Sequence, residues 1–156
     1  MGYTGHLLEQ ESFGEPLLSE EEKKRYMKYG DAMNLLKEKQ AFEPSDPEPR
    51  FANDLHASVA ERLGLEDYGK LKFFSSVGSP LDIYHGVDAF LELEGKDGKK
   101  HVVTMDISGN PNKNKGKADV LINMPFEGLD PKEDKEKYME KISETTNEIA
   151  EKLKDF

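Results

Sequence analysis

Cysteine is absent from this chain of 156 residues, which excludes a disulfide framework, a thiol nucleophile and a thiolate metal site. Long apolar runs are absent too, and none approaches the roughly 20 residues of a membrane-spanning helix. Residues 1–16 contain neither the basic region nor the apolar stretch of a signal peptide. We therefore expect a soluble, cytoplasmic protein that does not associate with membranes.

Common catalytic and nucleotide-binding motifs are missing as well. The sequence contains no phosphate-binding P-loop, no G-x-G-x-x-G, no G-x-S-x-G and no H-E-x-x-H. The remaining candidates for a functional site are acidic residues on adjacent apolar segments.

The chain has a clear excess of negative charge. It carries 22 Lys and Arg against 32 Asp and Glu, a net charge of −10. Residues 1–50 carry 7 basic and 11 acidic side chains, residues 51–126 carry 9 and 11, and residues 127–156 carry 6 and 10. The acidity therefore lies mainly in the flanks. It argues against a general nucleic-acid binder, which needs clustered Lys and Arg.

The first 50 residues are predicted to form a helical arm that ends in a proline-rich linker. Residues 1–18 are mixed in composition and indicate a loose arm. Ser19 followed by three glutamates is typical of a capped helix start. This helix is expected to reach about Lys39, or to divide into two short helices because Gly30 weakens its middle. The segment 43–50 holds three prolines and predicts a linker or an extended crossing segment.

Residues 51–126 are predicted to form the core. Leu55, Val59 and Leu63 recur at helical spacing, and Asp97-Gly98 is a typical hairpin turn between two apolar strands. The expected elements are a helix over 53–63 and strands over 71–76, 82–94, 101–107 and 118–123. A C-terminal helix over 127–156, opening at Asp130-Pro131, would pack on this core. The fold class is therefore a mixed α/β or α+β layer domain with a central antiparallel hairpin flanked by helices.

Two aspartates lie inside apolar strand segments. Asp88 follows Gly86-Val87, and Asp106 stands near the end of the returning strand. A carboxylate in such surroundings costs free energy, and two on paired strands repel each other. Mg²⁺, which prefers oxygen ligands, would relieve both penalties. Alternatively, each aspartate caps a loop or pairs with one of the lysines of the 109–117 loop.

These residues resemble the PD-(D/E)XK nuclease superfamily, which has the restriction-endonuclease-like fold. The resemblance covers roughly residues 53–123 and implies an αβββαβ core. It implies that Asp88 and Asp106 hold Mg²⁺, and that Glu61 on the 53–63 helix supports the site. The family places a lysine two residues after the second acid, where it positions or activates the attacking water.

The sequence departs from this pattern in two places. Ser108 stands where the family has its lysine, and Lys117 is the best substitute, with a role in stabilising charge on the phosphate. A loop of nine residues, 109–117, replaces the long crossover helix. Lys113 and Lys115 in that loop are candidate contacts to a phosphate backbone, although a solvated turn explains them equally.

The sequence leaves more than one role open for the histidines. His85 is either a third metal ligand or proton carrier, or a loop histidine with a local hydrogen bond. His56 and His101 are expected to be half-buried or to face solvent.

The leading hypothesis is a Mg²⁺-dependent phosphodiester hydrolase that acts on nucleic acid. The alternative is a noncatalytic interaction module, an inactive relative of the nuclease fold. In that case its acidic helices would bind a protein partner or a second copy of the chain.

Overall fold

The computed structural model describes all residues except 1, 111, 113–115, 126 and 154–156. It contains four strands and seven helical segments in its described part. In chain order these are α1 (Gly2–Phe13), α2 (Glu20–Lys24), α3 (Tyr29–Glu38), α4 (Arg50–Arg62), the 3₁₀ turn η1 (Tyr68–Lys70), β1 (Leu71–Ser75), α5 (Pro80–His85), β2 (Ala89–Glu94), β3 (Lys100–Ser108), β4 (Val120–Asn123) and α6 (Lys135–Leu153).

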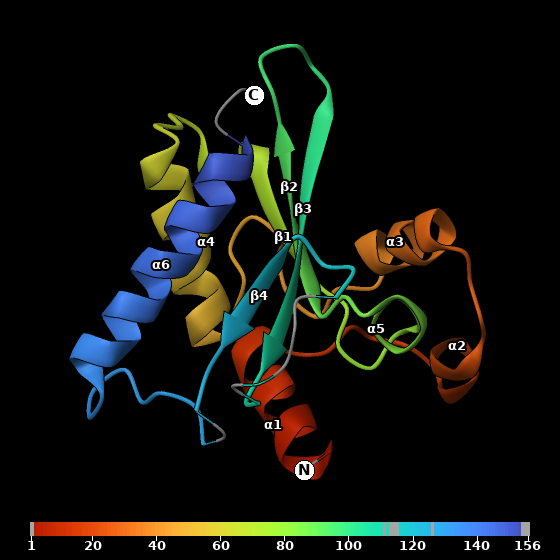
Figure 1. Cartoon of the computed structure of the whole chain (residues 1–156). Helices are drawn as coiled ribbons and strands as arrows, with labels where there is room; N and C mark the ends of the chain where they lie inside the picture. The colour runs from red at the N-terminus through yellow and green to blue at the C-terminus, as the bar shows by residue number, and fades with distance from the viewer. Residues whose placement is uncertain (1, 111, 113–115, 126, 154–156) are drawn as a thin grey trace.

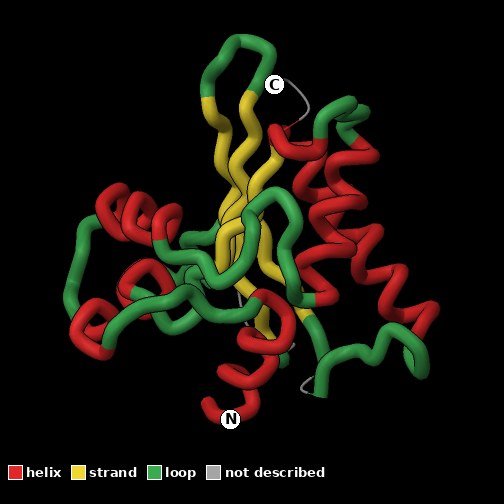
Figure 2. Tube along the Cα trace, turned by 180° about the vertical axis from the view of Figure 1, so that it is seen from behind, coloured by secondary structure: helices red, strands yellow, loops and turns green. Residues whose placement is uncertain are grey.

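A four-stranded mixed sheet forms the middle layer (Figures 1 and 2). The strand order is β1-β2-β3-β4, with β1, β2 and β3 antiparallel and β4 parallel to β3. The predicted fold class, a mixed α/β layer domain with a central hairpin flanked by helices, is confirmed. The β3–β4 connection contains no helix among its described residues.

Helices cover both faces of this sheet. On one face, side chains of α1, α4 and α6 join Phe73, Leu91, Met105 and Ile122 in the larger core. On the other face, α3 and α5 bury a smaller cluster around Phe74 and Phe90. Both faces of β2 are therefore shielded from solvent, and Glu94 is the one exposed residue of this strand.

The N-terminal segment differs from the expected loose arm. Residues 2–13 form α1, and Leu8 and Phe13 are buried in the larger core. Sequence periodicity gave no sign of this helix because two side chains anchor it rather than an apolar stripe. The predicted helix start is confirmed, because Ser19 and Glu22 form a capping box, and two short helices follow. The break lies at residues 25–28 and not at Gly30, which is part of α3.

The predicted strand over 82–94 is wrong in its first part. Residues 80–85 form α5, which Ser79 caps and Pro80 opens. Gly86 ends the helix at φ +70, a conformation that a glycine adopts without strain. This correction matters for the site because it turns Asp82 from a strand residue into a helix residue beside the sheet edge.

The proline-rich segment runs along the outer strand. The Pro44 carbonyl accepts a hydrogen bond from Phe73 N–H at 2.8 Å, so the segment covers part of the free edge of β1. The helix expected to start at Asn53 begins earlier, at Arg50. The last helix begins later than expected, at Lys135, because Asp130 caps a turn through Lys132 and Glu133.

Within the described part of the chain, no helix combines the length and the apolar character that a bilayer crossing requires.

Replacing Phe13 by Ala tests whether α1 belongs to the core. Phe13 is 0% exposed and its ring lies 5.5 Å from that of Phe73 and 6.2 Å from that of Phe51. We expect Phe13→Ala to lower the free energy of unfolding by about 3–5 kcal/mol in urea denaturation. Leu17→Ala, at a site that is 65% exposed, is the matched control and should change it by less than about 0.5 kcal/mol. Equal effects of the two changes would contradict a packed α1.

Candidate functional site

Asp88 and Asp106 lie close together where β2 begins and β3 nears its end, and their side chains are hydrogen-bonded. The register pairs Ala89, the first residue of β2, with Met105, and Asp88 directly precedes this pair. The N–H of Asp88 donates to the Met105 carbonyl at 2.8 Å, so pairing of the backbones extends to this point. Because side chains alternate along β3, Asp106 lies on the face opposite Met105 and Ile107, whereas Asp88 precedes β2 and its side chain lies beside those of Asp106 and Asp82.

Asp88 is held deep in the protein. It is 1% exposed and Asp106 is 7% exposed. Asp88 Oδ2 accepts the backbone N–H of Ile107 at 2.9 Å, and the Asp88 carbonyl accepts the N–H of Ser76. One carboxylate oxygen is thus fixed by the neighbouring strand, which orients the group.

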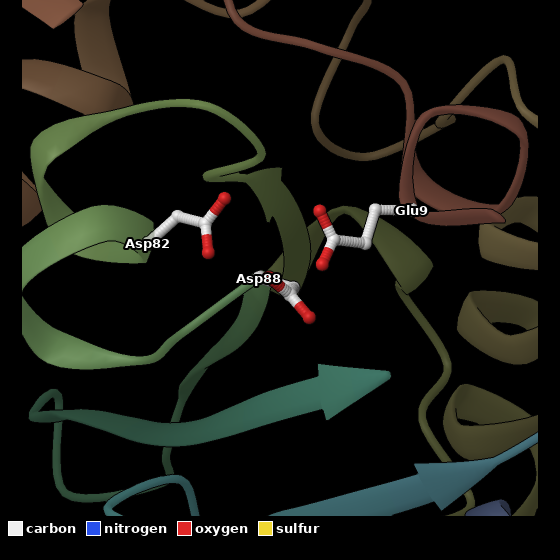
Figure 3. A group of neighbouring side chains, drawn as sticks. All are labelled: Glu9, Asp82 and Asp88. Atoms are coloured by element: carbon white, nitrogen blue, oxygen red, sulfur yellow. The ribbon is translucent and has the colours of Figure 1, made fainter. Parts of the chain in front are cut away.

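Two further acids reach the same space from helices. Glu9 on α1, Asp82 on α5 and Asp88 each offer an oxygen, and these atoms lie within 4.8 Å of one another. Figure 3 shows the three carboxylates directed towards a common space. Asp82 Oδ2 also accepts the N–H of Gly78 at 2.8 Å. Asp106 does not belong to this group of three, but its side chain is hydrogen-bonded to Asp88 and its charge acts on Asp82. We call these four carboxylates the acid cluster.

The acid cluster changes the protonation of its members. Burial is the largest cause that raises the pKa of Asp88 to about 11, and the hydrogen bond to the Asp106 side chain and the charges of Asp82 and Glu9 act in the same direction. Burial also raises the pKa of Asp82. In the absence of a cation, Asp88 therefore keeps at neutral pH a proton that an ordinary aspartate has lost. This proton lowers the repulsion within the acid cluster.

His6 is a basic group beside the acid cluster. It precedes Glu9 by one turn of α1, with Nδ1 3.8 Å from Glu9 Oε2 and Nε2 3.2 Å from Glu15 Oε1. Its charge opposes the raised pKa of Asp82. This histidine lies in the segment that the sequence suggested was a loose arm, and it had no predicted role.

The structure places the other predicted site residues apart from the acid cluster. Glu61 is exposed on α4 and lines a groove against α6 with Ser58, Met139 and Ile142, so Glu9, not Glu61, is the helical glutamate beside Asp88. Lys117 is exposed at the approach to β4 and pairs with no carboxylate among the described residues. Lys113 and Lys115 lie outside the described residues.

Ser108, which stands where the nuclease motif considered above has lysine, is buried at the end of β3. Its hydroxyl accepts the N–H of Asn110 at 3.0 Å and so begins the loop that follows. It lies on the same side of β3 as Asp106, as the alternation predicts.

The histidines named from sequence serve the fold. His85 Nε2 donates to the Met27 carbonyl at 2.8 Å, a bond to the N-terminal segment and not a local one. The expectation for His56 is wrong: it is buried, and its Nε2 donates to the Leu71 carbonyl at 2.6 Å. His101 is partly buried beside Asp97 at the hairpin.

Comparisons of the chain with protein-family models, with curated proteins and with solved structures found no match. The interpretation of the acid cluster therefore depends on its own residues.

The donor set is suited to a hard divalent cation. All the donors of the acid cluster are carboxylate oxygens, which Mg²⁺, Mn²⁺ and Ca²⁺ prefer, whereas zinc sites favour Cys and His. Two donors are on strands and two on helices, so a cation would join α1 and α5 to the central hairpin. The same ion would replace the protons that the buried carboxyl groups otherwise keep.

The raised pKa of Asp88 predicts an unusual pH dependence in the presence of a chelator. The group has a pKa near 3.8 when unfolded and about 11 when folded, so the folded state holds the extra proton between these values. The free energy of unfolding should therefore fall as pH rises from about 5 to about 9, with a slope of up to about 1.4 kcal/mol per pH unit.

Urea denaturation in EDTA measures this slope, and Asp88→Asn is the control because the amide oxygen can still accept the Ile107 N–H. The variant should lose the Asp88 contribution, leaving only the slope due to other groups. Identical slopes for the two proteins would show that Asp88 does not retain a proton.

Proposed function

We propose that the protein is a Mg²⁺-dependent phosphodiester hydrolase acting on nucleic acid. The observation that carries this proposal is the convergence of Asp88, Asp82 and Glu9 within 4.8 Å, with Asp106 facing Asp88 across the hairpin. A set of close carboxylates with Asp88 buried and Glu9 and Asp82 partly buried is costly to maintain for structure alone, because like charges repel and burial disfavours their ionisation.

The residues of the acid cluster have different proposed roles according to their positions. Asp88, fixed by the Ile107 N–H, and Asp106 are the proposed principal ligands. Glu9 and Asp82 complete the oxygen set from the helices on either side. The bound ion would supply a polarised phosphate oxygen and an activated water, the two contributions that hydrolysis of a phosphodiester needs.

The arrangement of the strands supports the resemblance to the PD-(D/E)XK nucleases. A helix, α4, precedes three antiparallel strands, and the fourth strand lies parallel to the third. The first acid directly precedes the second strand and the second acid lies on the third. Two differences remain: the crossover between β3 and β4 has no helix among its described residues, and the glutamate comes from α1.

The family's lysine needs a substitute in this chain. Lys117 precedes the Ala118-Asp119 pair, and Asp119 Oδ2 accepts the N–H of Thr104 at 2.9 Å, which ties this approach to β3 two residues before Asp106. Lys117 thus enters next to the strand that carries the site, with a long side chain free of ion pairs in the described structure. We propose that it stabilises charge developing on the phosphate.

The interaction module is the second candidate, and the buried Ser108 in the lysine position favours it. In that case the cation, if bound, stabilises the fold, and the acidic outer face of α6 contacts a partner.

Metal binding is the first test. Isothermal titration of the native protein with Mn²⁺ should give one saturable site, and Asp88→Asn combined with Asp106→Asn should weaken it by about 100-fold or more. Glu61→Gln is the matched control, because it also removes one carboxylate but on the exposed face of α4, and it should leave the affinity unchanged. Equal binding by the double variant would remove the site from consideration.

The role of Lys117 is tested by hydrolysis. We expect Lys117→Ala to lower kcat for a labelled oligonucleotide by about 100-fold, as for other groups that stabilise transition-state charge, with Mn²⁺ affinity unchanged. Lys99→Ala at the distant hairpin turn is the control and should retain activity. Native protein that binds Mn²⁺ but cleaves neither DNA nor RNA would favour the interaction module.

A further inference from the structure

A short basic segment interrupts the acidic N-terminal half. Residues 23–29, K-K-R-Y-M-K-Y, hold four basic side chains and no acid, whereas residues 1–50 as a whole carry an excess of acids. In the fold, Lys23 pairs with Glu20. Lys24, Arg25 and Lys28 are exposed and form no ion pair within the described part of the chain. They are therefore available to an anionic ligand.

Exposed aromatic rings stand among these charges. Tyr26 is 63% exposed and Tyr84, on α5, is 40% exposed. Their ring centroids lie 5.2 Å apart, edge to face. Tyrosine rings that are exposed to this extent contribute little to stability through burial. Two such rings next to each other form an apolar surface on which a flat ligand can stack.

The basic segment is held firmly in place. The Tyr84 hydroxyl donates to the Lys24 carbonyl at 2.8 Å, and His85 Nε2 donates to the Met27 carbonyl at 2.8 Å. His85 also lies against the Tyr29 ring, with centroids 5.6 Å apart. These contacts fix residues 24–29 against α5, so a ligand would meet a surface that is already ordered.

This surface adjoins the acid cluster. The six-residue helix α5 directs Asp82 towards Glu9 and Asp88, while its next residues, Ile83 and Tyr84, are exposed. α5 therefore carries both features, and a chain bound along residues 24–29 would lie against the helix that carries Asp82.

We propose that Lys24, Arg25, Tyr26, Lys28 and Tyr84, here named the basic aromatic surface, bind single-stranded nucleic acid and deliver it to the acid cluster. This inference rests on the proposed function for its place in a reaction, but binding can be tested without it. Phosphates would contact the three cations, and unpaired bases would stack on the tyrosines. A duplex conceals its base faces, so the surface selects single strands.

The test is fluorescence anisotropy with a labelled strand of about 20 nucleotides, in EDTA at about 50 mM salt, using the full chain. The same strand as RNA and as a DNA duplex forms two further arms. The single strands should bind at least about tenfold more tightly than the duplex. Lys24→Ser, Arg25→Ser and Lys28→Ser together should weaken binding about tenfold or more and reduce the salt slope by about 2.

A matched triple variant controls for net charge. Lys96 and Lys99 are exposed in the turn between β2 and β3, and the exposed Lys70 lines the same pocket as Lys96. Replacement of these three lysines by Ser should change binding by less than about threefold. Tyr26→Ala should weaken binding about fivefold or more, whereas Tyr68→Ala, at an exposed tyrosine on η1, should not. Circular dichroism checks that each variant is folded.

The outcomes separate this inference from the proposed function. The double variant Asp88→Asn with Asp106→Asn should still bind single-stranded nucleic acid in EDTA. Loss of metal binding or of hydrolysis alone would therefore not contradict the proposed role of the basic aromatic surface. Equal affinity for duplex and single strand, equal effects of the two triple variants, or no binding by the native protein would each overturn it. A dimer that dissociates on Tyr26→Ala would also overturn it, because a second copy would then be the occupant.

Discussion

The opposition of Asp88 and Asp106 is the constraint on which the rest of the structure depends. The tight turn at Asp97-Gly98 sets the β2–β3 register, and that register puts the two acids side by side. A slip of β3 by one residue would turn Asp106 towards the apolar core beneath α4 and α6. The register that buries Leu91 and Met105 in the larger core is thus the same register that brings Asp106 next to Asp88.

Features determined by local chemistry could be predicted from the sequence. The hairpin turn, the capped helix at Ser19 and the apolar stripe around Val59 each depend on residues within a few positions, and each is present. Asp88 and Asp106 could also be selected, because charged residues inside apolar strands need an explanation. Their convergence followed from a hairpin that the sequence made plain.

The helices that complete the acid cluster could not be predicted in the same way. α1 has few apolar side chains, and it is anchored chiefly by Leu8 and Phe13 in contact with elements far along the chain. α5 has only six residues, too short for periodicity to distinguish it from the strand that follows. Glu9 and Asp82 lie on these two helices. Their contribution depends on tertiary packing, which a single sequence does not display, and Glu61 was preferred because its helix was the visible one.

The position of α5 reconciles the acidic composition of the chain with the nucleic-acid substrate that we propose. Net charge governs long-range attraction, but contact is decided within about 10 Å at ordinary salt, where local charges dominate. Asp82 of α5 lies among carboxylates that a divalent cation would neutralise. Tyr84 of the same helix contacts the basic aromatic surface through the Lys24 carbonyl. With an ion bound, both surfaces beside α5 would attract phosphate, while the acidic flanks would repel strands that approach elsewhere. Under the proposed function, the negative flanks would restrict where a nucleic acid binds without preventing its binding.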